Sequence, residues 1–416
     1  IDFFIRTTDE GHKEFVQEFL RRIYDNGDVY QDVYAGLYCV GCEAFKTEAD
    51  LVDGKCPDHG VAPEWLEEKN WFFRLSAYED KLLELYERPD FVLPAFRANE
   101  AKGFIAGGLR DFSISRATQT WGIPIPWDPD QVAYVWADAL INYLSALSYA
   151  PGVDLGLWPG RHLLGKDILR FHCVYWPAML LSAGYEPPQQ LFVHGYLNID
   201  DKKISKSLGN AVDPFELIDR FGVDPVRFWV ARIVPFGQDG DVTIESFTER
   251  YDRELANDLG NLLSRTTAMI ARYRDGEVRA VPDDKGDLAA AATKVHDEVP
   301  AALDRWDVTG ALETIWDYVR GLNRYVEQTK PWELAKDADR SDELDRALYE
   351  LADGLRVAAV ALSAYLPETS VRILEALGQP LDVAWGNVAY AGLVPVTGIE
   401  ASAPLFPRID EPVTAP

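Results

Sequence analysis

The first half of the chain alternates strand-like and helix-like patterns. Apolar residues recur at helical spacing over 14–26, whereas residues 30–39 are rich in Val and Tyr and residues 70–75 in aromatic side chains. The first pattern predicts a helix, and the other two predict strands. A β-branched and aromatic run predicts a further strand over 132–136, followed by a helix over 137–146. Alternation of this kind is typical of an α/β fold.

The second half changes to helical patterns. Asp213 and Pro214 have the sequence of a helix start, as N-cap and first-turn residue, and a second short helix is expected over 226–231. Further helices are predicted over 244–273, 288–304, 308–328, 331–336, 341–366 and 371–377. These helices predict an antiparallel bundle. The tail from Val394, rich in Pro and Val, is expected to be extended and packed against it.

The composition indicates a folded protein of several domains. A chain of 416 residues, 47% of them hydrophobic, exceeds one ordinary core, so two or three domains are expected. The net charge of -27 opposes general attraction to nucleic acid, so RNA contacts must use local basic patches, such as the arginines between residues 220 and 279. Without a bilayer-spanning apolar run or a signal-peptide layout, a cytoplasmic protein with no membrane partner is expected.

Three of the four cysteines lie in one short segment. Cys39 with Cys42, and Cys56 with His59, form two pairs with two residues inside each pair. Such pairs form tight turns that direct four ligands toward one tetrahedral ion and leave no open position. The spacing predicts one structural zinc ion, with a disulfide or unrelated thiols as alternatives. Cys173 lies in an apolar helical pattern and is expected to be buried.

Residues 202–210, with the sequence KKISKSLGN, combine cations, hydroxyls and a flexible backbone. Lys203 and Lys206 offer point charges for phosphate, while Ser205 and the backbone beside Gly209 offer further hydrogen-bond donors. The segment therefore predicts a clamp for a polyanion. The alternative is a solvated basic loop.

A second candidate site follows the strand pattern that ends at Gly165. Asp167 comes directly after it, where a helix is expected to begin. In a doubly wound α/β fold, ligands bind at the carboxyl ends of the strands, so a glycine followed by a carboxylate suits a ribose site. The alternative is a carboxylate that only stabilises the helix N-terminus.

Several motifs occur together between residues 136 and 210. They are His162-Leu-Leu-Gly-Lys-Asp-Ile168, Phe171-His172, Trp176-Pro177, Phe192-Val-His-Gly-Tyr-Leu197 and Lys203-Ile-Ser-Lys-Ser207. With this combination the chain resembles the class I aminoacyl-tRNA synthetases, and among them the methionyl-tRNA synthetases. The resemblance implies a doubly wound α/β, Rossmann-type nucleotide-binding domain with a zinc-knuckle insertion, followed by an α-helical bundle that binds the anticodon.

The resemblance also implies a division into domains. The expected parts are a remainder of the first half of the catalytic domain (1–29), a connective insertion (30–116) with the zinc knuckle (39–59), the second half of the catalytic domain (117–212), a linking stem-contact fold (213–243), the anticodon-binding bundle (244–393) and a C-terminal tail (394–416). Residues 1–7 resemble an internal strand of the catalytic domain.

The resemblance assigns substrate-binding residues. The expected methionine-binding residues are Trp136, Leu140, Tyr143, Ile168 and His172. An unbranched, polarisable thioether suits an apolar pocket with aromatic faces, although each residue alone is also typical of a core. Leu140 stands where many family members have proline. The expected ATP-binding residues are Gly165 and Asp167 at the ribose, His194, Gly195 and Leu197 at the adenine, and Lys203 and Lys206 at the phosphates, with Ser205 holding the loop.

A separate set of residues is expected at the anticodon. Asn261 and Arg265 lie four residues apart and therefore on one face of a helix, and Trp332 opens a later helix. By resemblance these three residues bind the anticodon, since stacking and base-edge hydrogen bonds are the usual way to read single-stranded RNA. The alternatives are a polar pair within a helix and a core tryptophan.

The implied activity is that of a methionine-tRNA ligase. Methionine and ATP, with Mg²⁺, give methionyl-adenylate and pyrophosphate, and the acyl group then passes to the 3′ end of tRNA(Met), including the initiator tRNA. Lys203, Ser205 and Lys206 are the expected catalytic residues, since catalysis here is mainly positioning and charge stabilisation. A monomer is expected.

One motif of the family is missing. The His-x-Gly-His signature does not occur, and Gly11-His12 does not replace it because Asp9 holds the position of the leading histidine. The sequence is therefore expected to be truncated or to follow a further segment, and a chain that began at Ile1 is expected to be inactive in adenylation. The alternatives are a tRNA-binding module without adenylation activity and another class I synthetase. Valine, isoleucine and leucine enzymes carry a long editing insertion that residues 1–136 lack, and a cysteine enzyme would spread its zinc ligands over the fold.

Overall fold

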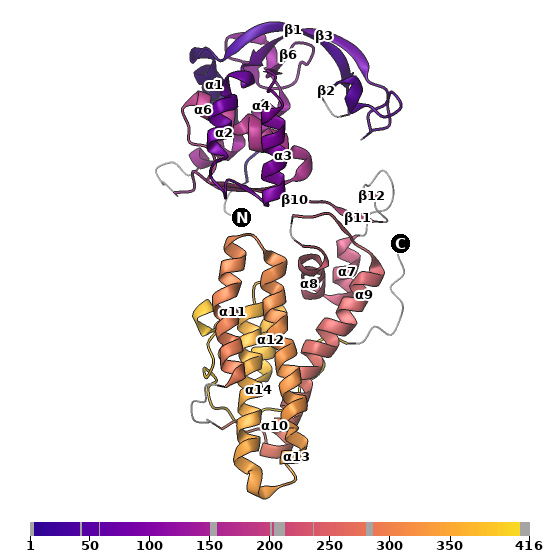
Figure 1. The fold of residues 1–416 in the computed structure, drawn as a ribbon, viewed down its shortest axis with the longest axis vertical. Coiled ribbons are helices and arrows are strands. Elements are labelled where there is room, and N and C mark those ends of the chain that lie inside the picture. The colour runs from indigo at the N-terminus through magenta and orange to yellow at the C-terminus, as the bar shows by residue number, and fades with distance from the viewer. Residues whose placement is uncertain are drawn as a thin grey trace. The chain divides into compact units, whose positions relative to one another are not determined.

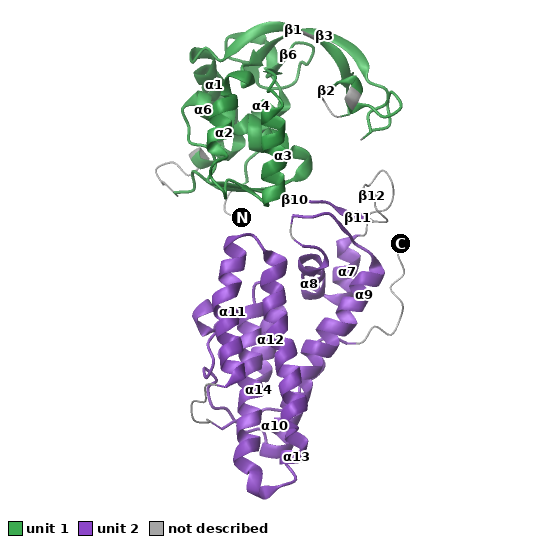
Figure 2. Cartoon of the chain, viewed as in Figure 1, with its two compact units in different colours: residues 1–194 green, residues 195–416 purple. Residues whose placement is uncertain are grey.

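The computed structural model describes residues 4–41, 44–57, 59–149, 156–199, 202–203, 213–235, 237–279 and 286–407. The chain forms two compact units, Ile1–His194 and Gly195–Pro416 (Figure 2). Each unit has a hydrophobic core of its own. Unit 1 combines helices with sheets and unit 2 is mainly helical (Figure 1), as the two halves of the sequence pattern predict.

A parallel sheet lies in the core of unit 1. Its strands are, in spatial order, β4 (Val92–Leu93), β10 (Gln190–His194) and β9 (Arg161–Gly165). Residues 190–193 of β10 are buried, as expected of a parallel strand that is covered on both faces. Helices α1 (Glu10–Asp25) and α6 (Trp176–Ala183) pack together, with Phe19 stacked on Trp176 at 5.8 Å between ring centroids.

A long antiparallel ribbon extends away from the helices of unit 1 (Figure 1). Its sheet has the order β2 (Ala44–Lys46), β1 (Val29–Cys39), β3 (Glu64–Phe73) and β5 (Phe112–Ser113). Strands β1 and β3 pair from Val29 opposite Phe73 to Tyr38 opposite Glu64. The ribbon thus presents the cysteine-rich segment at its far end. A second antiparallel sheet has the order β6 (Ser115–Arg116), β8 (Asp128–Ala133) and β7 (Pro124–Ile125).

The remaining helical elements of unit 1 are short. They are η1 (Glu48–Asp50), η2 (Leu75–Tyr78), α2 (Glu79–Leu85), α3 (Ala95–Ala106), α4 (Val135–Ala139), α5 (Asn142–Ser145), η3 (Ala146–Tyr149), η4 (Lys166–Ile168) and the π-helical segment η5 (Phe171–Tyr175).

The structure differs from the sequence predictions at three segments of unit 1. The strand expected over 132–136 ends at Ala133, and the helix expected over 137–146 is split into α4 and α5. The Val135-Trp136 pair favours a strand locally, but Trp136 packs on Phe171 with 4.4 Å between ring centroids, and tertiary packing overrides local propensity. Residues 4–7 form no strand within the described part of the chain. There the Arg6 N–H donates to Asp9 Oδ2 at 3.0 Å and turns the backbone into α1.

Unit 2 begins with a small sheet and continues as helices. The strands have the order β12 (Lys202–Lys203), β11 (Leu197–Ile199) and β13 (Gly240–Asp241). The helical elements are α7 (Pro214–Phe221), α8 (Val223–Ile233), α9 (Ile244–Arg250), the π-helical segment η7 (Tyr251–Gly260), α10 (Asn261–Arg274), α11 (Asp287–Asp304), α12 (Val308–Thr329), α13 (Pro331–Leu334), η8 (Ala338–Arg340), α14 (Ser341–Leu362), α15 (Pro367–Ala376) and η9 (Trp385–Asn387). Helix α14 contacts α10, α11 and α12 and is buried along most of its length, so it is the centre of the bundle.

The start of α7 and the tail agree with the sequence predictions. Asp213 is the N-cap, its carboxylate accepts from the Phe215 N–H at 2.8 Å, and Pro214 is in the first turn. The tail packs against the bundle through a backbone bridge between Val278 and Val396 and through buried Phe406. No helix in the described parts of the chain combines the length and apolar character that crossing a bilayer requires.

Candidate functional site

The structure brings aromatic and imidazole side chains together in unit 1. The Trp136 ring lies edge-on to His172 at 6.1 Å, and the Tyr143 hydroxyl lies 3.0 Å from His172 Nε2. Trp136 and Tyr143 are only partly buried, whereas His172 is buried. The two partly exposed rings are therefore accessible to a ligand, unlike the fully buried side chains of the core.

The hydrogen bonds of His172 determine its state. Its Nδ1 lies 3.1 Å from the Ile168 carbonyl, which only accepts, so Nδ1 carries the proton. Nε2 then accepts from the Tyr143 hydroxyl. Burial lowers the pKa of His172 and raises the pKa of Tyr143, so both groups are neutral near pH 7. This arrangement forms a fixed chain of hydrogen bonds from Ile168 to Tyr143.

The structure thus connects four of the five residues expected to bind methionine, namely Trp136, Tyr143, Ile168 and His172. Leu140 lies at the end of α4 and is buried among the core residues of unit 1.

His162 is a neighbour that the sequence reasoning did not assign to the pocket. Its ring lies 4.1 Å from that of Tyr143, and burial lowers the pKa of His162 to about 4. Residues 161–164 of β9 alternate between exposed and buried, which places His162 and Leu164 on the inner face. This alternation, together with the position of His162 at the start of the 162–168 motif, is the sequence feature that indicates a side chain facing the pocket.

The candidate nucleotide residues of unit 1 lie at the carboxyl ends of parallel strands. Gly165 ends β9 and lies opposite His194, which ends β10. A Cβ on Gly165 would lie 2.8 Å from Asp167 Oδ1, so the Asp167 carboxylate lies directly against this glycine. The arrangement has the geometry of a ligand site at the ends of strands.

The other candidate nucleotide residues belong to unit 2. A Cβ on Gly195 would lie 2.3 Å from the Gln238 carbonyl oxygen, so only glycine fits this close backbone approach. Leu197 begins β11, where it is partly exposed, and the backbone of Lys203 pairs with Asn198. Ser205 and Lys206 lie outside the described residues.

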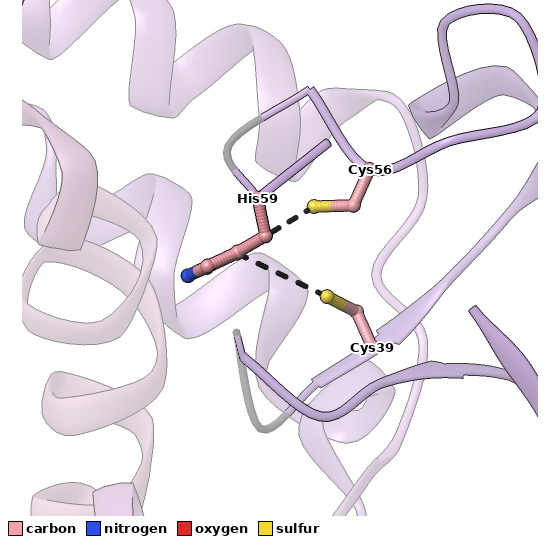
Figure 3. A group of neighbouring side chains, drawn as sticks. All are labelled: Cys39, Cys56 and His59. Carbon is pink, nitrogen blue, oxygen red and sulfur yellow. Dashed lines mark hydrogen bonds between the residues drawn. The ribbon is translucent and has the colours of Figure 1, made fainter. Parts of the chain in front are cut away.

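Cys39, Cys56 and His59 converge at the far end of the β1–β3 ribbon (Figure 3). His59 Nδ1 lies 3.9 Å from Cys39 Sγ and 3.8 Å from Cys56 Sγ, and both thiols are free of disulfides. Ligand atoms about 3.5–3.8 Å apart form the edges of a tetrahedron at ordinary zinc bond lengths. The three residues therefore fit a zinc ion, whereas Cys42 lies outside the described residues.

Two of the three candidate anticodon residues meet in unit 2. The Arg265 guanidinium lies 5.7 Å from the Trp332 ring and donates to Glu327 Oε1 at 2.8 Å. Lys330, with φ of 47°, turns the chain from α12 into α13 and so directs Trp332 toward α10. Asn261 is exposed at the start of α10, one helical turn from Arg265.

Known proteins resemble this chain over almost all of its length. A family model described as "tRNA synthetases class I (M)" matches residues 1–62 and 49–267. The chain belongs to this class I tRNA synthetase family. The methionine-tRNA ligase of Caldanaerobacter subterraneus is 45% identical over 98% of the chain, and that of Bacillus subtilis is 42% identical over 98%. The chain spans 66% and 65% of the lengths of these two relatives.

Solved structures of the class I synthetase family confirm the predicted fold class. The Mycobacterium tuberculosis methionyl-tRNA synthetase in complex with methionyl-adenylate matches with a TM-score of 0.89 and 41% identity, over 98% of this chain and 83% of that one. The apo form of the same synthetase matches with a TM-score of 0.86 and 40% identity, over 99% of this chain and 84% of that one. The division into six domains stays a prediction.

Proposed function

We propose that this chain carries part of the first half and the second half of the catalytic domain, the zinc-knuckle insertion and the anticodon-binding domain of a methionine-tRNA ligase. It would activate L-methionine with ATP to methionyl-adenylate and transfer the methionyl group to the 3′ end of tRNA(Met). The observation that carries the proposal is the cluster of Trp136, Tyr143 and His172 in a chain 41% identical to a synthetase solved with methionyl-adenylate.

The amino-acid pocket would use this cluster to recognise a thioether. An aromatic face gives favourable contact with a polarisable sulfur, and the neutral His172 and Tyr143 avoid the burial of a charge next to an apolar side chain. The hydrogen bond from Tyr143 to His172 would hold the phenol in place, with Ile168 fixing the imidazole from the other side. Leu140 would close the pocket from the end of α4.

The ATP site would use the residues that the family resemblance assigns to it. The expected contacts are Gly165 and Asp167 at the ribose, His194, Gly195 and Leu197 at the adenine, and Lys203, Ser205 and Lys206 at the phosphates. Synthetases of this class use ATP with Mg²⁺. A methionine carboxylate oxygen attacks the α-phosphorus and pyrophosphate leaves. A ribose hydroxyl of the tRNA then attacks the acyl carbon and AMP leaves. The lysines would stabilise the charge on the departing pyrophosphate.

Zinc and the tRNA anticodon would each bind a separate set of residues. Cys39, Cys56 and His59, with Cys42 as the fourth ligand, would hold one structural zinc ion that orders the end of the ribbon. Arg265 and Trp332, with Asn261, would contact the anticodon of tRNA(Met), initiator tRNA included. We further propose a cytoplasmic monomer with the domain division given by the sequence analysis.

The test is methionine-dependent exchange between ATP and pyrophosphate by the protein, expressed with any coding sequence that precedes Ile1 and checked at its N-terminus by intact mass, and by its Lys206→Ala variant. We expect exchange that requires methionine and falls on the order of a hundredfold in the variant, because one cation at the leaving phosphates is lost. The control is Lys336→Ala, an exposed lysine paired with Glu333, which should leave exchange unchanged. Retained binding of tRNA without any exchange would reject the ligase and support a tRNA-binding module.

A further inference from the structure

His12 is a fully buried polar side chain near the start of α1. Its Nε2 lies 2.7 Å from Asp138 Oδ1, and its Nδ1 lies 2.7 Å from Ser145 Oγ. These partners are 126 and 133 residues further along the chain. The imidazole therefore connects α1 to two distant elements, because Asp138 lies in α4 and Ser145 ends α5.

In a neutral His12 ring, only one of the two tautomers can form both hydrogen bonds. The carboxylate of Asp138 only accepts, so Nε2 carries the proton and donates to Oδ1. Nδ1 then accepts from the Ser145 hydroxyl. Ser145 is fully buried, and 17% of the Asp138 side chain is exposed. Loss of the imidazole would leave a largely desolvated carboxylate and a buried hydroxyl without this partner.

The two contacts lie on opposite sides of a break in the helix. Helix α4 ends at Ala139 and α5 begins at Asn142, so the intrahelical ladder does not hold the two pieces in one rigid rod. Asp138 follows Trp136 by two residues, and Ser145 follows Tyr143 by two residues. Each half of the broken helix therefore presents one ring of the candidate pocket and one hydrogen-bond partner of His12.

A purely structural role does not require a histidine at this position. The other buried residues of α1 are apolar, namely Val16, Phe19, Leu20 and Ile23, and an apolar side chain at position 12 would bury surface without desolvating an imidazole. A ring with one donor and one acceptor instead fixes the distance and orientation of its two partners.

We propose that His12 is a positioning residue for the amino-acid pocket. It holds α4 and α5 at a fixed spacing and so fixes Trp136 relative to Tyr143. The inference rests on the proposed function, since it assigns His12 to the recognition of methionine. His12 would act through Asp138 and Ser145.

The test compares His12→Ala, His12→Gln and Ser145→Ala with the control Gln17→Ala. Gln17 also lies on α1 and donates across to the Pro124 carbonyl at 3.0 Å, but it contacts neither α4 nor α5 through a hydrogen bond. We measure the KM for methionine and for ATP by pyrophosphate exchange, and amide hydrogen exchange over residues 135–147. Each variant is first checked for folding by circular dichroism.

For His12→Ala and Ser145→Ala we expect a methionine KM that rises on the order of tenfold or more, because small displacements of pocket groups are costly, with little change in the KM for ATP. Amide exchange over 135–147 should become faster in both. His12→Gln should recover much of the loss, since an amide offers both an N–H donor group and an acceptor oxygen. Gln17→Ala should resemble the wild type.

The outcomes separate this inference from the proposed function. A wild-type protein without methionine-dependent exchange overturns the proposed function, and amide exchange then decides alone whether His12 holds the two helices together. With an active wild type, an unchanged methionine KM in a folded His12→Ala protein overturns the inference, even if its melting temperature falls. An equal effect of Gln17→Ala overturns it as well.

Discussion

At the scale of single residues, His162 makes stability depend on pH. Burial holds its pKa at about 4, below the ordinary value of 6.5, so the unfolded chain binds the proton more tightly than the folded chain. The corresponding stabilisation is complete above about pH 6.5 and is lost as the pH falls toward 4. A shift of this size corresponds to about 3 kcal/mol. The contribution of His162 to the free energy of unfolding should therefore be largest at neutral and alkaline pH.

The prediction is that His162→Phe flattens this part of the pH profile. Phenylalanine keeps a ring against Tyr143 but cannot take up a proton, so the variant should lose less unfolding free energy than the wild type between pH 6.5 and 4. Urea unfolding at several pH values measures the difference. Parallel profiles for the two proteins would show that His162 titrates alike in the folded and unfolded chains.

Candidate site residues could be selected one by one from the sequence, but most contacts between them could not be predicted. The order of Gly165 and Asp167 after an apolar run follows from local sequence, and the two residues do lie against each other. The contact between Tyr143 and His172 joins positions 29 residues apart through a π-helical turn, and no local pattern encodes that turn. No local pattern predicts the contacts of His12, because its partners Asp138 and Ser145 lie 126 and 133 residues away in the sequence.

At the scale of elements, a buried ion pair connects α14 to residues 387–391, which follow α15. Arg356 donates to Asp353 Oδ1 at 2.8 Å and to the Asn387 carbonyl at 2.8 Å, while Asp353 Oδ2 accepts from the Ala391 N–H at 2.7 Å. Asp353 is fully buried and Arg356 nearly so. The pair therefore provides fixed hydrogen bonds for an irregular segment with little secondary structure.

The prediction is that Arg356→Met destabilises unit 2 by about 3–5 kcal/mol, because it leaves the Asp353 carboxylate buried without its partner. Arg340→Met is the matched control, since Arg340 forms an exposed, solvent-screened pair with Glu343 at the same spacing and should leave stability nearly unchanged. Thermal unfolding followed by circular dichroism measures both. Equal melting temperatures for the two variants would contradict the assigned role of the buried pair.

The cysteine-rich end of the ribbon gives a second prediction at this scale. Cys56→Ser should reduce the bound zinc from about one ion per chain to a small fraction, because a hydroxyl is a poor zinc ligand compared with a thiolate. Amide exchange over residues 36–62 should rise in the same variant. Cys173→Ser, which changes a buried thiol outside the cluster, should keep its zinc. Metal analysis after dialysis decides between these outcomes.

Elements with strong local signals were predicted best. Helix α7 begins where the Asp213-Pro214 pair places it, because cap and proline act within one turn. The sequence pattern predicts the end of the strand at residue 136, whereas α4 already begins at Val135. Val135 and Trp136 favour a strand by residue type, but Trp136 packs on Phe171 from within a helix. The periodic helices α11 and α12 were placed to within one residue at each end.

At the scale of the whole molecule, the proposed activation of methionine and the proposed recognition of tRNA involve residues of different compact units. The candidate methionine residues lie in unit 1 and the anticodon residues in unit 2. We predict that Trp332→Ala weakens binding of tRNA(Met) by about 1–3 kcal/mol, the usual contribution of one stacked base. Methionine-dependent pyrophosphate exchange should stay unchanged, because it needs no tRNA.

The matched control is Trp385→Ala, another partly buried tryptophan of unit 2, whose indole donates to the His296 carbonyl. Filter binding with tRNA(Met) and with a transcript of altered anticodon measures the effect. Equal losses for both transcripts would show that Trp332 supports the bundle and does not read the anticodon.

The π-helical turn at Phe171–Tyr175 also bears on how the chain can change during evolution. A π turn is equivalent to an α-helix that has gained one residue, so removal of one residue from this turn restores a regular helix. That deletion would improve local hydrogen bonding and at the same time rotate His172 relative to the helix that follows. Loss of this residue would therefore give a more regular helix and a different direction of the His172 imidazole.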